Sequence, residues 1–460
     1  MIRYLLLNVL LLIPFISVGN PPYVERFLQC EGLESASVGV VVKRISDGES
    51  VVEINPNQSM RLASVTKLFP TWFALEQYGA EYRYRTPICR TGRVVGGTLK
   101  GNIIIKPSAD PTFNSRYFPQ SDVIAEIAAI LQRHKIKKIE GKIIVDKGES
   151  QMLECDIPGS WVWEDLSNYY AATPHAINFR DNSYIVEFRS GDVGSVTEIQ
   201  NTYHKPKDIE LINQVVSSER SVDNAWIYGG PYSNTLYIKG SIPANRDSFQ
   251  IRGATPNPET VFVEELCQYL ESQNIIVVGE SISFGEMTKI GVVESPTLKE
   301  IISVTNKVSC NLFAESLGTL VGGSDSWGDR VEELLRERGV DRSGLKLRDA
   351  SGLSPQSVAS AATITDLLVY IATRDLDKEF ANSLAHSGRE GSLSLYGSKL
   401  PTGSTLMAKT GSMADVQCLA GYVENRKKEL FAFAILVNYH TCSRKYLQEV
   451  VATLLSEEFD

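Results

Sequence analysis

The chain has 460 residues, with 46 lysines and arginines against 55 aspartates and glutamates, and a formal net charge of −9 at pH 7. The acidic residues are spread along the chain, and nothing in this balance suggests a basic groove for nucleic acid. The length predicts two to four domains and is sufficient for large buried cores.

The first nineteen residues have the pattern of a secretory signal. Arg3 supplies one positive charge, a mostly apolar run follows over residues 4–17, and small residues precede Asn20. The alternative is a transmembrane anchor, but the run is shorter than the roughly 20 residues that a bilayer needs. We therefore predict a signal peptide over residues 1–19 and export to the periplasm or cell envelope, with at most peripheral membrane association.

Strand patterns at both ends of the chain, with helical patterns between them, predict one α/β domain that an insertion interrupts. Strands are predicted over residues 36–43 and 49–54, and a helix over 64–78, in which Pro70 produces a kink unless it falls in the first turn. The later predicted helices cover residues 298–305, 311–321, 326–338, 363–373 and 443–457, and the later strands 407–424 and 430–438.

The insertion has a different texture. Short predicted strands alternate with polar turns, and residues 174–254 contain no strong helical pattern. We predict an α/β (α+β) multi-domain chain with a discontinuous main domain, an inserted second domain and a nested, mostly-β third domain. Their predicted ranges are 20–84 with 296–460, 85–173 with 255–295, and 174–254. The insertion's predicted strands cover 99–105, 142–146 and 235–242, and its helices 122–132 and 258–273.

The cysteines and histidines exclude several common kinds of site. The seven cysteines include no C-x-x-C pair and no zinc-ligand spacing, and their odd number leaves one unpaired in a monomer. The five histidines occur without a G-x-S-x-G elbow or an H-E-x-x-H helix, so a Ser-His-Asp triad and a metallopeptidase are disfavoured. We expect no metal or organic cofactor. The cysteines are Cys30, Cys89, Cys155, Cys267, Cys310, Cys418 and Cys442.

A serine and a lysine open the first long predicted helix. Ser64 and Lys67 are three residues apart, which places both side chains on one helix face within reach of each other. The N-terminus of a helix favours a developing oxyanion, and a lysine whose pKa is lowered by burial can act as a base. Alone the motif is weak, since Ser343 and Lys346 repeat its spacing between two helices, beside Gly344.

Two further short motifs follow. Ser309 and Asn311 stand where a turn meets a helix, a position that suits proton relay and substrate binding but also an ordinary helix cap. Lys409 and Thr410 lie on the first of the C-terminal strands and offer a charge and a hydroxyl to a carboxylate. Gly411 lets a substrate backbone approach the sheet edge, although a turn at the strand start explains it equally.

The three motifs together are far more specific than any one of them. Ser-x-x-Lys, Ser-x-Asn and Lys-Thr-Gly in this order are typical of penicillin-binding proteins and serine β-lactamases. The 241 residues between Lys67 and Ser309 exceed what a compact β-lactamase needs. The chain resembles the class C low-molecular-mass penicillin-binding proteins, the D-alanyl-D-alanine carboxypeptidase/endopeptidase family of the penicillin-binding protein 4 type. Further matching segments are residues 97–102, 109–112, 158–166, 169–172 and 349–354.

The resemblance implies a serine β-lactamase/DD-peptidase-like catalytic domain with two nested extra domains. It implies acylation of Ser64 by peptidoglycan stem peptides and by β-lactams, with Lys67 as base and Ser309 and Asn311 completing the site. Lys409 and Thr410, followed on the strand by Gly411, are expected to bind the terminal carboxylate.

The same resemblance assigns the remaining expected site residues. The backbone N–H groups of Ser64 and Ser412 are expected to form the oxyanion hole. Asp110 is expected to reach the free amine of a diaminopimelate-type stem peptide, with a plain turn before Pro111 as the alternative. The chain departs from the family pattern at Pro70, Cys310, Ala350 and Ser412, none of which removes a functional group.

Three functions compete on these grounds. The first is a serine peptidase that releases terminal D-alanine and cuts D-alanyl crosslinks through one acyl-enzyme. The second is a β-lactamase or esterase that uses the same machinery, which the long insertion disfavours. The third is a non-catalytic peptidoglycan-binding homologue or envelope scaffold, which the intact motifs disfavour. The oligomeric state stays open.

Overall fold

The computed structural model describes residues 21–148, 157–231, 233–280, 282, 285–323, 326–374, 377–387, 393, 396 and 399–459. The predicted signal peptide and Cys155 lie outside these residues. Within them, no helix combines the length and the apolar character that crossing a bilayer requires.

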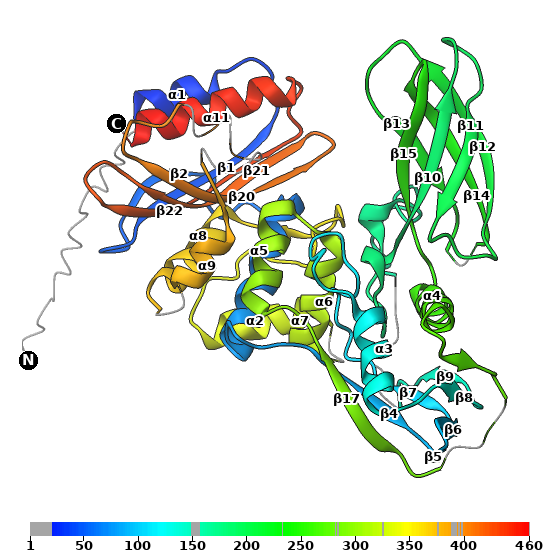
Figure 1. The fold of residues 1–460 in the computed structure, drawn as a ribbon. Coiled ribbons are helices and arrows are strands. Elements are labelled where there is room, and N and C mark those ends of the chain that lie inside the picture. Colours follow the sequence, from blue (N-terminus) through cyan, green and yellow to red (C-terminus); the bar gives the residue numbers. More distant parts are fainter. Residues whose placement is uncertain are drawn as a thin grey trace, which may run out of the picture.

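A six-stranded antiparallel sheet joins the two ends of the chain (Figure 1). Its strand order is β19-β20-β21-β22-β1-β2, and the contact between the chain ends is the pairing of β1 with β22. The predicted strand run near the C-terminus resolves into two strands with a tight turn between them. The strands are β1 (Ser37–Arg44), β2 (Ser50–Ile54), β19 (Ala385–His386), β20 (Thr405–Met413), β21 (Val416–Glu424) and β22 (Leu430–Asn438).

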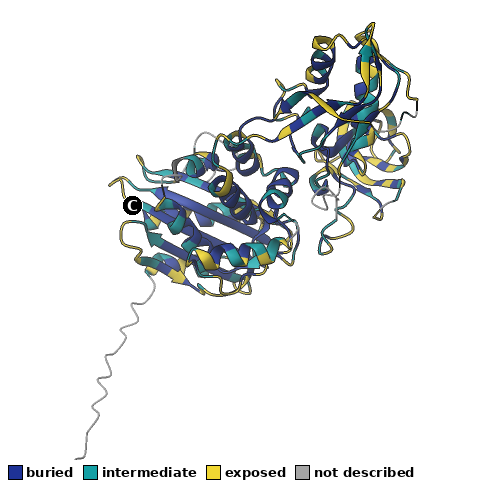
Figure 2. Ribbon diagram, turned by 90° about the horizontal axis from the view of Figure 1, so that it is seen from below, coloured by how far each residue is buried: buried dark blue, intermediate teal, exposed yellow. Residues whose placement is uncertain are grey.

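Helices cover both faces of this sheet, so its strands are buried (Figures 1 and 2). Along β1, Val38, Val40 and Val42 pack in the core beneath α1 and α11, whereas Val41 packs in the core on the opposite face. This alternation is the period-two pattern of a strand. The helices are α1 (Pro22–Leu28), α2 (Leu68–Tyr78), α5 (Leu298–Val308), α6 (Asn311–Gly322), α7 (Trp327–Glu337), α8 (Ala361–Ala372), α9 (Asp377–Ser383) and α11 (Arg444–Glu458).

Two four-stranded sheets and two helices follow the first helical segment. One sheet has the order β17-β4-β7-β9 and the other β16-β8-β6-β5. The single strand predicted over residues 99–105 is wrong, because Gly101 and Asn102 divide it between the two sheets. The elements are β4 (Arg85–Arg90), β5 (Arg93–Val95), β6 (Thr98–Lys100), β7 (Ile103–Ile105), α3 (Val123–Arg133), β8 (Lys138–Ile139), β9 (Ile143–Val145), α4 (Pro258–Ser272), β16 (Ile276–Val277) and β17 (Thr288–Glu294).

Two three-stranded sheets share a core of their own, which contains Phe188, Ile227 and Ile238. The elements agree with the mostly-β texture of residues 174–254, while the division of the chain into three domains stays a prediction. The strands are β10 (Ser183–Ser190), β11 (Glu198–Tyr203), β12 (Glu210–Ser218), β13 (Asn224–Tyr228), β14 (Thr235–Pro243) and β15 (Arg246–Ala254). A small sheet pairs β3 (Met60–Arg61) with β18 (Val358–Ala359).

Candidate active site

The segment that carries Ser64 is a short 3₁₀ helix, Ala63–Lys67, and α2 begins only at Leu68. The sequence predicted one continuous helix over 64–78, so this boundary is a correction. The division places Pro70 in the first turn of α2, where a proline is tolerated. In a 3₁₀ helix, side chains three residues apart eclipse each other, and Ser64 and Lys67 therefore point the same way.

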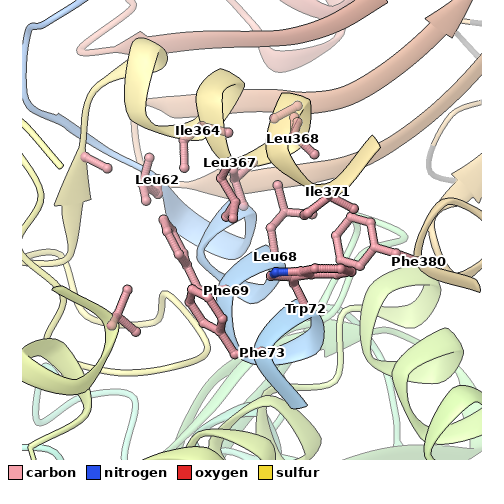
Figure 3. Packing of buried hydrophobic residues seen from close by; sticks show 14 of the residues in the cluster. Leu62, Leu68, Phe69, Trp72, Phe73, Ile364, Leu367, Leu368, Ile371 and Phe380 are labelled. Atoms are coloured by element: carbon pink, nitrogen blue, oxygen red, sulfur yellow. The ribbon is translucent and has the colours of Figure 1, made fainter. Parts of the chain in front are cut away.

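A dense apolar core fixes the position of this segment (Figure 3). Phe69, Trp72 and Phe73 of α2 are fully buried in a core cluster that also contains Leu367 and Ile371 of α8 and Phe380 of α9. Protein interiors are close-packed, so a helix held in this way has little freedom to shift. The serine is thus attached to a tightly packed helix.

Lys67 is the centre of the site. Its side chain is 0% exposed, and its Nζ lies 2.9 Å from Ser64 Oγ. The same nitrogen donates to Asn311 Oδ1 at 2.6 Å and to the backbone carbonyl of Ser351 at 2.7 Å. Burial lowers the pKa of Lys67 from 10.5 to about 8, although nearby acidic groups oppose the shift. Roughly a tenth of the amine is therefore neutral at pH 7.

Two buried carboxyl groups lie behind the lysine. Glu315 of α6 accepts hydrogen bonds from the backbone N–H groups of Ala350 and Ser351. Burial and the neighbouring Asp349 raise the pKa of Glu315 to about 7. Asp349 accepts from Trp161 Nε1 at 2.9 Å, which ties the inserted segment to the site. These bonds hold the loop that presents the Ser351 carbonyl to Lys67.

The second motif is connected to both neighbouring motifs. Besides accepting from Lys67, the Asn311 amide donates from Nδ2 to the Tyr170 carbonyl at 2.8 Å, which leaves one N–H for a ligand. Ser309 has a φ of +66°, an uncommon conformation for a residue other than glycine. Its Oγ accepts a hydrogen bond from Lys409 Nζ at 3.0 Å.

The third motif lies on β20, at an edge of the six-stranded sheet. In the described part of the chain, β19 pairs with β20 only at Met407 and Ala408, so the following residues can pair with an added strand. Gly411 lies against the serine segment, and a Cβ there would be 2.5 Å from the Leu62 carbonyl oxygen and 3.1 Å from Ser64 N. Only glycine permits this approach, which brings β20 beside the backbone N–H of the serine.

Lys409 occupies a different environment from the one that the sequence suggested. It is 1% exposed, and burial together with the charge of Lys67 lowers its pKa well below the usual range. Its Nζ contacts Ser309 Oγ and the Thr410 carbonyl. Lys409 therefore donates a hydrogen bond to the hydroxyl of Ser309 from the buried side of the site.

A cavity of about 630 Å³ opens in front of the serine. Of the predicted site residues, it is lined by Ser64, Ser309, Asn311 and Ser412, while Lys67, Lys409, Thr410 and Gly411 are not among the lining residues. Asp110 is not among the lining residues. Its carboxylate is buried and accepts from the backbone N–H and the hydroxyl of Thr112, and burial raises its pKa to about 6. Its expected contact with a substrate amine stays a prediction.

Several residues of this site were not predicted from the sequence. Glu315 lies four residues after Asn311, and this spacing on one helix face was an available signal. Arg61, Trp226 and Tyr228 also line the cavity, but only the tertiary fold brings them there. Burial raises the pKa of Cys310 to about 12, so its thiol stays protonated and is a poor nucleophile. Within the described ranges, no group of three potential metal ligands gathers.

Sequence comparison identifies relatives along nearly the whole chain. The model of the D-Ala-D-Ala carboxypeptidase 3 (S13) family matches residues 23–457. The D-alanyl-D-alanine carboxypeptidase DacB of Haemophilus influenzae is 24% identical over 423 residues, which cover 88% of this chain and 86% of the relative. The D-alanyl-D-alanine carboxypeptidase of Actinomadura sp. is 27% identical over 474 residues, covering 94% and 84%.

Structural comparison shows the same architecture in a solved protein. The crystal structure of penicillin binding protein 4 from Haemophilus influenzae superposes with a TM-score of 0.79 at 22% identity, covering 95% of this chain and 99% of that one. A second structure of that protein, complexed with a β-lactam, gives a TM-score of 0.75 at 22% identity, with the same coverage of both chains. The two chains therefore share their fold along nearly their entire length.

Proposed function

The chain belongs to the D-Ala-D-Ala carboxypeptidase 3 (S13) family, and from this premise we propose that Ser64 is the nucleophile of its reaction. The protein is a serine-type D-Ala-D-Ala carboxypeptidase, a hydrolase of the class C low-molecular-mass penicillin-binding type. The observation that carries the assignment of the nucleophile is the position of Lys67 Nζ, between Ser64 Oγ and Asn311 Oδ1.

Acylation follows from this geometry. The neutral amine of Lys67 accepts the proton of Ser64 as Oγ attacks the carbonyl carbon of the penultimate D-alanine, which forms the C–O bond. The backbone N–H groups of Ser64 and Ser412 stabilise the resulting oxyanion. Collapse of the tetrahedral intermediate breaks the C–N bond, and the leaving amine takes a proton through Ser309. The ester is then hydrolysed by water, which regenerates the serine.

The remaining motif residues position the substrate. The free N–H of Asn311 suits a backbone carbonyl of the peptide, and the edge of β20 suits pairing with its extended backbone. At this edge of β20, the hydroxyl of Thr410 binds the terminal carboxylate of the substrate, and the neighbouring Lys409 assists it. Cutting of D-alanyl crosslinks requires the same acyl-enzyme, so we include endopeptidase activity in the proposal.

Peptidoglycan stem peptides and β-lactams are the proposed ligands. The β-lactam complex of the Haemophilus influenzae protein supports the second class, because its fold matches this chain. We propose export to the periplasm or cell envelope, where the polymer is located. A β-lactamase on the same machinery remains the competing proposal, and slow release of a penicillin adduct distinguishes the peptidase from it.

Mapping of a penicillin adduct tests the assignment of the nucleophile. The protein is labelled with a fluorescent penicillin, digested and analysed by mass spectrometry, and D-alanine release from a pentapeptide ending in D-Ala-D-Ala is measured in parallel. We expect a stable adduct on Ser64 together with D-alanine release. An adduct on Ser343, or rapid penicillin turnover without D-alanine release, would refute the proposal.

The rate of acylation is expected to depend on the protonation of Lys67. Because its pKa is lowered to about 8 and the neutral form is the base, the rate rises with pH up to about 8 and then levels off. Stopped-flow measurement of penicillin acylation between pH 6 and 9.5 gives this profile. A rate that falls as pH rises through this range would contradict the role of the amine.

A further inference from the structure

A second cavity, of about 320 Å³, lies between the insertion and α6. It shares no lining residue with the cavity in front of Ser64, so a ligand bound in it does not occupy the catalytic site. The insertion contributes the segments that directly follow β7 and β9, two strands that pair in parallel. Ligand sites of α/β proteins commonly lie beyond the carboxyl ends of such strands. The helix contributes Ser316, Thr319 and Leu320.

Two residues of this lining carry hydroxyl groups that the protein leaves unsatisfied. Tyr84 is 2% exposed and Ser316 is 1% exposed, and both line the cavity. Neither Tyr84 Oη nor Ser316 Oγ has a hydrogen-bond partner among the residues that the structure describes. Because nearly all buried polar groups of folded proteins are hydrogen-bonded, an unsatisfied one requires an explanation. Two of them at one cavity indicate a polar ligand that accepts their hydrogen bonds.

The same cavity carries a cation and an anion side by side. Lys106 Nζ donates to Asp146 Oδ2 at 2.6 Å, and both side chains line the cavity and stay partly exposed. The hydrogen bonds from Lys106 and from the Gly148 N–H lower the pKa of the Asp146 carboxyl, which is therefore ionised at neutral pH. Lys147, the other charged residue of the lining, pairs with Glu259 at 3.0 Å. A ligand with both a negative and a positive group complements this arrangement.

We propose that this second cavity binds a small α-amino acid in its zwitterionic form. The carboxylate accepts from Lys106 and from the hydroxyls of Tyr84 and Ser316. The ammonium group donates to the carboxylate of Asp146. Leu320 contributes an apolar part of the lining, which suits a short aliphatic side chain such as that of alanine. Both enantiomers of alanine have this chemistry, and the D form is also what the proposed reaction releases.

The test measures binding to the penicillin-acylated protein, in which the cavity in front of Ser64 is blocked. Isothermal titration calorimetry uses D-alanine, L-alanine, propionate and ethylamine as probes. We expect at least one enantiomer of alanine to bind, and propionate and ethylamine, which each lack one charged group, to bind about tenfold more weakly or less. Tyr84→Phe is expected to weaken alanine binding about tenfold without lowering the melting temperature, because the hydroxyl that it removes has no partner in the protein. Tyr82→Phe is the matched control and retains binding, since its ring lies 5.5 Å from that of Tyr84 but outside the lining.

The outcomes separate this site from the catalytic one. Absence of alanine binding to the acylated protein overturns the inference, and so does propionate that binds as tightly as alanine. Undiminished binding in the Tyr84→Phe protein places the ligand elsewhere and also overturns it. If Tyr84→Phe does not fold, Ser316→Ala decides by the same titration. Penicillin labelling and D-alanine release, measured in parallel, report the proposed function separately; if penicillin does not label the protein, the titration of the unlabelled wild-type and Tyr84→Phe proteins decides.

Discussion

Replacement of Ser64 by alanine is expected to abolish both the penicillin adduct and the release of D-alanine, with a loss of kcat on the order of 10³- to 10⁶-fold. The reason is that the serine supplies the oxygen that forms the new bond. Among the described residues, Ser64 carries the only hydroxyl to which Lys67 Nζ is hydrogen-bonded. The residual rate comes from substrate binding and from the oxyanion donors. Intact-mass spectrometry after penicillin treatment and a D-alanine assay give the two readouts.

Ser343→Ala is the matched control for this experiment. Ser343 has the same spacing to a lysine as Ser64, but its side chain is exposed and its hydroxyl donates to Asp341 at 2.8 Å. We expect wild-type labelling and activity from this variant, and a near-normal melting temperature from both variants. Activity that survives in Ser64→Ala, or disappears in Ser343→Ala with the fold intact, would reverse the assignment.

The contrast between these two serines shows how far the site can be predicted from the sequence. The order of three short motifs predicted the region of the site, and the structure brings Lys67 within 2.6 Å of Asn311 across 243 intervening residues. The spacing of residues in the sequence does not predict that these two side chains are in contact. It depends on how α2 and α6 pack against each other, which is a property of the whole core.

Local chemistry predicted most elements but not all of their boundaries. The proline in the catalytic segment signalled an irregular helix, and the irregularity is a change from 3₁₀ to α geometry directly after Lys67. The strand predicted over residues 99–105 failed because its apolar run continues through Gly101-Asn102, where the chain passes to another sheet. An apolar run indicates a strand, whereas the strand with which it pairs is decided by the tertiary fold.

Buried polar residues were the least predictable part of the site. Glu315 occurs in an otherwise apolar helical stretch, where a charged residue would ordinarily indicate the exposed face. Its position becomes understandable only with the backbone N–H groups of Ala350 and Ser351, which satisfy it. The aromatic side chains of the cavity were missed for a related reason, since Trp226 lies on β13, far from Ser64 in the sequence, and only the tertiary fold brings it to the cavity.

Replacement of Lys67 by arginine is expected to reduce the acylation rate on the order of 10²- to 10⁴-fold, the usual contribution of a general base. Arginine preserves the buried positive charge near Asp349 and Glu315, but it does not lose its proton in proteins. The arginine variant therefore tests the loss of proton transfer separately from the loss of the buried positive charge. In the Lys67→Arg protein the acylation rate no longer rises with pH up to about 8, because the amine that titrates in this range is absent. Stopped-flow acylation from pH 6 to 9.5 measures both effects.

Lys67→Ala extends this argument from rate to stability. It leaves Asn311 Oδ1 and the Ser351 carbonyl without their buried donor, which costs about 1–3 kcal/mol for each group that stays unsatisfied. We expect a lower melting temperature than for Lys67→Arg at a similar loss of rate. Lys346→Ala, in the exposed copy of the motif, serves as the control and retains wild-type rate and stability. An arginine variant with the wild-type rate and pH profile would show that another group takes the proton from Ser64.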